Sequence, residues 1–311
     1  MKIKNITRKK VNTRVYNIGT IPNHTYLVED IVVHNCYQGS TPEGKHASLE
    51  RIRQLEPKLS SWETVTEYAI GGGEPTQHPD FDGILRILKN KRTIINFTTR
   101  IPADQWSDKV LEAVKETVTG IAYSVDKVDE LHKFIDSHVN LVTPTLNSKD
   151  SRGGRKVKLY FHLIPELMND DEFRNIIAEI EEINREYTNG YTWNDPLIHV
   201  TLLGLKNIGR ASGMHREPRP EIIDVITGTG FTPIGIDTKF AHDYQTFLDS
   251  KGIDRKLYTT EEGVYSMYVD AVNELAYKSS YELDNPVRVE DNTGSLKYSD
   301  RIFKELKEIE Q

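Results

Sequence analysis

The chain has 311 residues, a net charge of −7 and 37% hydrophobic residues, which allows one large or two ordinary globular domains with a packed core. It has no run of the roughly 18 apolar residues that a membrane helix needs, and no apolar signal core near its start, so we expect a cytoplasmic protein and no membrane partner. Its single cysteine, Cys36, excludes an intramolecular disulfide and a cysteine-rich metal site built from this chain alone.

The charge is distributed unevenly on the two sides of Cys36. Residues 1–35 contain six basic and two acidic residues, a net charge of +4, which leaves −11 for the rest of the chain. A basic segment can bind nucleic acid, but here the basic residues alternate with β-forming residues and do not gather on a helix. An acidic protein partner explains the charge equally well, so nucleic acid is not the expected partner.

The first 35 residues consist of short apolar segments separated by turns. The pattern predicts strands at 14–20, 25–28 and 30–33, with a turn at 21–24. A β-rich segment of this length buries too little surface to fold alone. We therefore expect a second polypeptide to complete its fold.

From Cys36 onward apolar strands alternate with amphipathic helices, which is typical of a parallel α/β sheet or barrel. Residues 139–146 have an extended character that could add one further strand. The strands are predicted at 66–70, 93–98, 118–125, 157–163 and 197–203, and the helices at 46–56, 81–90, 104–117, 127–138, 170–187 and 218–229.

The tripeptide His34-Asn35-Cys36 directly follows the last predicted N-terminal strand. An asparagine amide can attack its own backbone carbonyl and cleave the next peptide bond, while a neighbouring imidazole gives a proton to the leaving amine. The thiol of Cys36 can accept an acyl group at the same junction. By itself such a tripeptide is also compatible with a chance match or a turn.

Residues 15–19, 23–26 and 31–36 closely resemble the C-terminal piece of an intein. The spacing and the initial methionine are those of the naturally split inteins of replicative DNA polymerase genes. The family usually has an aspartate where this chain has Asn17, which concerns the rate of the transfer step.

The intein resemblance implies a role for each residue at the junction. Residues 1–35 would be a β-rich fragment of the HINT fold, completed by an N-terminal intein piece. Asn35 would be the cyclising residue, His34 its assistant and His24 the second histidine of the active centre. Cys36 would be the nucleophile that begins the retained protein.

A second candidate site follows the predicted strand 66–70. Gly71, Gly72 and Gly73 allow the backbone to approach a ligand closely, and Glu74 stands at the carboxyl end of the strand, where catalytic groups of α/β barrels collect. The alternative is a glycine turn with a solvated glutamate. Cys36 likewise has two interpretations, because a lone cysteine is often a small buried hydrophobe.

The loop after Cys36 and the Gly-Gly-Glu-Pro segment together resemble the radical S-adenosylmethionine (SAM) superfamily, including the separation of 36 residues between Cys36 and Gly72. The resemblance implies a partial (β/α)6 TIM-like barrel that lacks its first strand, over residues 36–215, and a C-terminal extension over residues 216–311. It also implies a [4Fe–4S] cluster with Cys36 as one ligand, and S-adenosylmethionine as the second cofactor. The residues expected to bind S-adenosylmethionine at this turn are Gly72, Gly73, Glu74 and Pro75.

Three further residues fit the same resemblance. Ser124 and Asp126 stand where the family contacts the ribose, and Arg210 stands where it meets the cofactor carboxylate. The alternatives are that Ser124 and Asp126 cap the helix predicted to start at residue 127 and that Arg210 is a surface charge.

The family needs three cysteines and a first barrel strand. The two missing cysteines and the missing strand would all lie before Cys36. The two resemblances together imply that a separate polypeptide carries that strand, two cysteines and the N-terminal intein piece. Trans-splicing would join its product to Cys36 and release residues 1–35. With electrons from a flavodoxin-like or ferredoxin-like reductant, the joined enzyme would cleave S-adenosylmethionine to a 5′-deoxyadenosyl radical.

The C-terminal part of the chain indicates a substrate class, and two other functions stay open. Residues 232–282 resemble the extension of radical enzymes that modify peptides or proteins, although the cysteines of an auxiliary cluster are absent. One rival is a non-catalytic, degenerate barrel that binds S-adenosylmethionine and acts as an interaction module. The other is a metal-dependent hydrolase that uses His162, His199 and Asp126.

Overall fold

The structure is a computed structural model, and it describes the greater part of the α/β body. The residues that it describes are 26–28, 31–33, 45–60, 65, 67–89, 93–147, 157–187, 196–206, 213–214, 216–261, 266–277, 279–280, 283 and 286–289.

Two short strands near the N-terminus form an antiparallel pair. β1 (Tyr26–Val28) and β2 (Ile31–Val33) match the strands predicted there, and Tyr26 lies opposite Val33 in their register. Their apolar and β-branched residues favour the extended conformation. The strand predicted at 14–20 lies outside the described residues.

The body is built on one parallel sheet of six strands in sequential order. Every neighbouring pair in this sheet is parallel. The first five strands confirm those predicted from the sequence, and the sixth was not predicted. The strands are β3 (Glu67–Ile70), β4 (Ile94–Thr99), β5 (Gly120–Ser124), β6 (Lys158–Leu163), β7 (Ile198–Leu202) and β8 (Ile234–Ile236).

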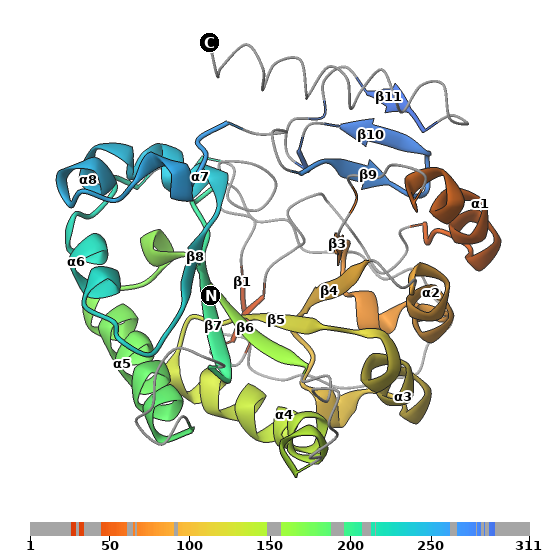
Figure 1. The fold of residues 1–311 in the computed structure, drawn as a ribbon, viewed down its shortest axis with the longest axis horizontal. Coiled ribbons are helices and arrows are strands. Elements are labelled where there is room, and N and C mark those ends of the chain that lie inside the picture. The colour runs from red at the N-terminus through yellow and green to blue at the C-terminus, as the bar shows by residue number, and fades with distance from the viewer. Residues whose placement is uncertain are drawn as a thin grey trace.

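Six helices lie on the outer side of this sheet. Figure 1 shows them in an arc around the curled strands, so that the molecule is a half-barrel with one covered face and one concave face. This confirms the expected partial barrel in its coarse form. The helices are α1 (Leu49–Ser60), α2 (Phe81–Leu88), α3 (Asp108–Thr117), α4 (Val128–Asn147), α5 (Asp170–Tyr187) and α6 (Glu221–Thr227).

Helix α4 is longer than the sequence predicts. The helix expected at 127–138 continues through residues 139–146 to Asn147, so this stretch does not add a strand. Its β-branched residues and Pro144 produce the extended signal, but helix and strand propensities are weak and tertiary context overrides them. In the described part of the chain, no helix combines the length and the apolar character needed to span a bilayer.

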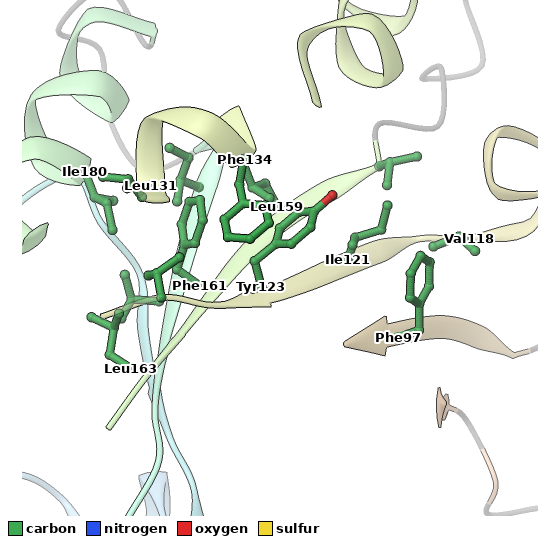
Figure 2. Close-up of a cluster of buried hydrophobic side chains, with 14 of the residues drawn as sticks. Phe97, Val118, Ile121, Tyr123, Leu131, Phe134, Leu159, Phe161, Leu163 and Ile180 are labelled. Carbon is green, nitrogen blue, oxygen red and sulfur yellow. The ribbon is translucent and has the colours of Figure 1, made fainter. Parts of the chain in front are cut away.

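The hydrophobic core lies between the sheet and its helices. Phe97, Ile121, Tyr123 and Phe161 are at most 2% exposed, and they come from three adjacent strands. Figure 2 shows Tyr123 and Phe161 beside Leu131 and Phe134 of α4, and Phe97 near Val118 at the other side of the cluster. Full burial of one such side chain contributes about 1.5–3 kcal/mol, so this layer carries much of the folding energy.

The segment after α6 contributes to two different sheets. β8 completes the parallel sheet beside β7, although it lies beyond residue 215. The short helices α7 (Thr238–Asp243) and α8 (Gln245–Ser250) follow it. The remaining strands form an antiparallel sheet of the order β11-β10-β9, namely β9 (Tyr268–Asp270), β10 (Leu275–Tyr277) and β11 (Val287–Arg288).

The small antiparallel sheet packs against α1, as Figure 1 shows at the upper right. Leu55 and Leu59 of α1 form a buried cluster with Ala276 and Val289. In the turn before β10, Glu274 Oε1 lies 2.6 Å from Arg51 Nη1 of the helix and forms an ion pair with it. The extension is therefore attached to the first helix of the body.

Candidate functional site

The two faces of the parallel sheet differ in chemistry because strand side chains alternate and parallel neighbours in register share a face. The covered face is apolar. The concave face carries half-buried polar side chains, and the register places Tyr160 beside His199 and His162 beside Thr201. The polar residues of this face are Glu67, Asn96, Thr98, Ser124, Lys158, Tyr160, His162, His199 and Thr201. A ligand on this face would meet hydrogen-bonding groups at every strand from β4 to β7.

The glycine segment after β3 is open, as the sequence predicted for a ligand-binding turn. Gly72 has a φ of 138°, a conformation that residues with a side chain rarely adopt. A Cβ atom added to Gly71 or Gly72 would meet no atom within 4 Å. The backbone of this turn is therefore accessible to a ligand at the carboxyl end of the sheet.

Glu74 is held in place by four hydrogen bonds from its surroundings. Its Oε1 accepts from Thr99 Oγ1 at 2.7 Å and from the hydroxyl and backbone nitrogen of Thr76 at 2.6 and 3.1 Å. Its Oε2 accepts from the backbone nitrogen of Arg100 at 2.9 Å. The carboxylate therefore bridges the ends of β3 and β4, and it is neither a freely solvated group nor mobile.

Ser124 and Asp126 lie at different positions relative to the concave face. Ser124 is the last residue of β5 and pairs with His162 in the sheet, so it belongs to this face. Asp126 is exposed, and its backbone nitrogen donates to Glu130 Oε2 at 3.3 Å. Burial and the neighbouring carboxylate of Asp126 raise the pKa of Glu130. Neither side chain forms a cap bond in the described start of α4, where the carboxylate of Glu172 accepts from the nitrogen of Val128.

The other predicted site residues lie outside the described part of the chain. They are His24, His34, Asn35 and Cys36 around the proposed splice junction, and Arg210 after β7. Their roles stay predictions.

A polar group at the ends of β6, β7 and β8 was not singled out from the sequence as one site. Lys206 Nζ lies 3.1 Å from Asp237 Oδ2, and Asp237 Oδ1 accepts from the backbone nitrogens of Gly204 at 2.9 Å and Phe240 at 2.7 Å. Asp237 caps α7, and an aspartate directly before a helix is a signal that could have been found. Gly204 is required here because an added Cβ would lie 2.5 Å from the nitrogen of Phe240.

His162 lies on the concave face near this ion pair. Burial lowers the pKa of His162 to about 4, and the charge of Lys206 acts in the same direction while that of Asp237 opposes it. The imidazole is therefore neutral at pH 7 and offers one donor and one acceptor. Lower on the same face, the rings of Tyr160 and His199 lie 4.9 Å apart.

The metal-dependent alternative is not supported by the geometry of the described residues. His162 and His199 belong to different rows of the sheet, since His162 pairs with Thr201 and His199 with Tyr160. Within the described ranges, no group of three or more His, Cys, Asp or Glu residues is placed to hold a metal ion.

Comparison with known proteins finds a family model that is similar to part of the body. Residues 34–180 match the family model described as Radical SAM superfamily. No curated protein matches the sequence of the chain. The matches concern the α/β body, so the intein resemblance of residues 1–35 stays a prediction.

Solved structures of SuiB from Streptococcus suis resemble the fold. SuiB bound to S-adenosylmethionine aligns with a TM-score of 0.54 and 13% identity over 87% of this chain and 63% of its own. SuiB bound to the precursor peptide SuiA aligns with a TM-score of 0.58 and 12% identity, over 87% of this chain and 62% of its own. The chain thus spans less than two thirds of these SuiB chains, and at such identities the likeness concerns the fold.

The superfamily uses a [4Fe–4S] cluster and S-adenosylmethionine, and the chain fits the two cofactors differently. A cluster of this kind is held by several thiolates, whereas the chain has only Cys36, so the chain alone does not fit it. The open glycine turn, the fixed carboxylate of Glu74 and the polar concave face fit S-adenosylmethionine. Residues 34–180, slightly less than half of the chain, are therefore similar to the radical SAM superfamily.

Proposed function

We propose that the chain supplies the S-adenosylmethionine-binding half-barrel of a radical SAM enzyme that acts on a peptide or protein. The observation that carries the proposal is the open turn at Gly72, with the fixed carboxylate of Glu74 beside it, at the carboxyl end of a polar concave face. Ligands of parallel α/β folds bind at this end of the strands.

Each predicted binding residue has a role that its position allows. The backbone at Gly72 accommodates the methionine moiety, because a Cβ atom added there would meet no atom within 4 Å, and the exposed Gly73 extends this contact. Glu74 accepts from the ammonium group of S-adenosylmethionine while Thr99 and Arg100 keep the carboxylate oriented.

The remaining groups extend this binding site. Pro75 is buried and begins the short helical turn that Glu74 caps. Ser124 is available to the ribose, and Arg210 and Asp126 are the further predicted contacts. When bound, the cofactors supply the radical chemistry.

The concave face suits a peptide better than a highly charged substrate. From the middle of the strands to their carboxyl ends it presents neutral donors and acceptors, among them Tyr160 and His162, which is uncharged at neutral pH. The charged Glu67 and Lys158 stand at the opposite ends of β3 and β6. Lys206 and Asp237 neutralise each other at its rim. The structure of SuiB with its precursor peptide supports a peptide substrate by analogy of fold.

A separate polypeptide completes the enzyme in this proposal. Within the described sheet, β3 pairs with β4 alone, so its other edge is available for parallel pairing with a strand of the partner. The partner also carries two cysteines and the N-terminal intein piece. Splicing uses Asn35, His34, His24 and Cys36 as set out above, and the family match begins at residue 34, beside this junction.

Binding of S-adenosylmethionine tests the proposed cofactor site. Isothermal titration of the purified chain should show binding that weakens by tenfold or more, at least about 1.4 kcal/mol, in Glu74→Ala. Thr99→Val is the matched control, because it removes one hydrogen bond to the same carboxylate but keeps the charge. Equal affinities of the wild-type chain and Glu74→Ala would contradict the site.

Intact mass spectrometry tests splicing. The chain is mixed with the N-terminal piece of a split DNA polymerase intein that carries an affinity tag, and the product should lack residues 1–35. Asn35→Ala should stop at a branched or unspliced species. Binding of S-adenosylmethionine without any ligation product would favour the alternative function, a non-catalytic interaction module.

A further inference from the structure

His78 forms two hydrogen bonds that connect separate parts of the chain. It follows the Gly-Gly-Glu-Pro turn by three residues, and its Nε2 lies 3.0 Å from the backbone oxygen of Ala47. Its Nδ1 accepts from the backbone nitrogen of Asp80 at 3.1 Å. Because Nδ1 is an acceptor, the neutral ring carries its hydrogen on Nε2 and donates it to Ala47.

The bond to Ala47 connects two regions of interest for the proposed function: the chain on the Cys36 side of α1 and the Gly-Gly-Glu-Pro turn. Ala47 is 11 residues after Cys36 and two residues before the start of α1. On the other side, the backbone nitrogen of His78 donates to the oxygen of Pro75 at 3.0 Å, so the ring is tied to the turn that Glu74 caps.

The surroundings of the ring restrict its movement. The ring of His46 lies edge-on to that of His78 with 4.9 Å between centroids. Close packing continues nearby, since an added Cβ at Gly83 of α2 would lie 2.7 Å from Leu49 Cδ1 of α1. The backbone just before α1, at His46 and Ala47, is thus held against the start of α2.

We propose that His78 is a positioning residue, which sets the backbone at Ala47, just before α1, relative to the S-adenosylmethionine turn at Glu74. The expected effect of His78 on binding of S-adenosylmethionine rests on the proposed function. The hydrogen bond to Ala47 sets this position, because it joins the turn region directly to the backbone before α1.

Two substitutions separate the two bonds of the ring. The amide of glutamine reaches about as far as Nε2, so His78→Gln keeps a donor for Ala47. The amide of asparagine overlays Nδ1, so His78→Asn keeps an acceptor for Asp80 and loses the bond to Ala47. Both variants place an amide in the same half-buried position, which makes them a matched pair.

Amide hydrogen exchange and isothermal titration are measured on the wild-type chain and both variants. We expect His78→Asn to raise exchange at residues 48–52 and to weaken binding of S-adenosylmethionine by roughly tenfold, the equivalent of one strong hydrogen bond, while His78→Gln restores both. Unchanged exchange in His78→Asn would overturn the proposal. So would faster exchange with unchanged affinity, because the bond would then be structural only.

Two other results of this experiment also test the role of His78. An equal loss in both variants would overturn the proposal, since the ring's packing against His46 would then matter and the bond to Ala47 would not. Absence of binding in the wild-type chain would reject the proposed function, and this role with it, before any His78 variant is compared.

Discussion

The two faces of the parallel sheet divide stability and chemistry between them. On the covered face Phe97, Tyr123 and Phe161 are almost completely buried under helices, as Figure 2 shows. One residue along the same strands, Thr98 and Tyr160 face the concave side and stay half-buried. The difference shows that the same six strands serve as a core on one side and as a candidate binding surface on the other.

The largest difference is expected between two adjacent residues of β6. Phe161→Ala should reduce the free energy of unfolding by about 3–5 kcal/mol, because it leaves a cavity in the buried face. Tyr160→Ala should cost about 1 kcal/mol, since its ring is half-buried. Urea unfolding of both variants measures this. Equal losses would mean that the concave face is also a packed core.

A pH titration of stability probes the covered face through His138. This residue is 1% exposed, its Nδ1 lies 3.0 Å from Tyr123 Oη, and burial lowers its pKa from 6.5 to about 4. The unfolded chain therefore binds a proton more readily, so the stability is complete above pH 6.5 and falls as the pH drops from 6.5 towards 4, by about 3 kcal/mol.

Two variants serve as controls for this titration, and the quantity compared is the slope of the unfolding free energy against pH. His138→Leu should remove its share of the slope whatever its effect on absolute stability. His162→Gln should remove a similar share from the concave face, because burial also lowers the pKa of His162 to about 4. A slope that both variants leave unchanged would show that neither imidazole is buried in the neutral form.

A smaller effect is expected from filling the concave face. In Gly120→Ala the new Cβ would lie 2.7 Å from Tyr160 Cε2 and 2.8 Å from Asn96 Oδ1, so these side chains must move. We expect a loss of about 1–2 kcal/mol of stability in thermal unfolding. Gly71→Ala, whose Cβ meets nothing within 4 Å, is the control and should cost less.

The smallest effect is expected away from both faces. Arg51 forms its ion pair with the turn before β10 while its side chain is 42% exposed. Arg51→Ala should therefore cost less than about 1 kcal/mol in urea unfolding. A much larger loss would show that this pair, and not the apolar cluster around Leu55, attaches the small sheet to α1.

Much of the fold could be predicted because the apolar periodicity of the body is strong. The first five strands of the sheet and the helices that follow them appear near their predicted positions. β8 has only three residues, too few for a recognisable period, and only its pairing with β7 makes it a strand. The end of α4 was missed because local propensity favoured an extended chain there.

For the candidate site, the sequence determined the residue types and their order: one cysteine, a Gly-Gly-Glu-Pro segment after a strand, and polar residues alternating with apolar ones. Tertiary structure decided which of them meet. Two of the four bonds to Glu74 come from residues 25 and 26 positions further along the chain. The contact of Lys206 with Asp237 joins two loops that only the adjacent ends of β7 and β8 bring together. Spacing along a chain specifies neighbours on one element, whereas neighbours on different elements depend on how those elements pack.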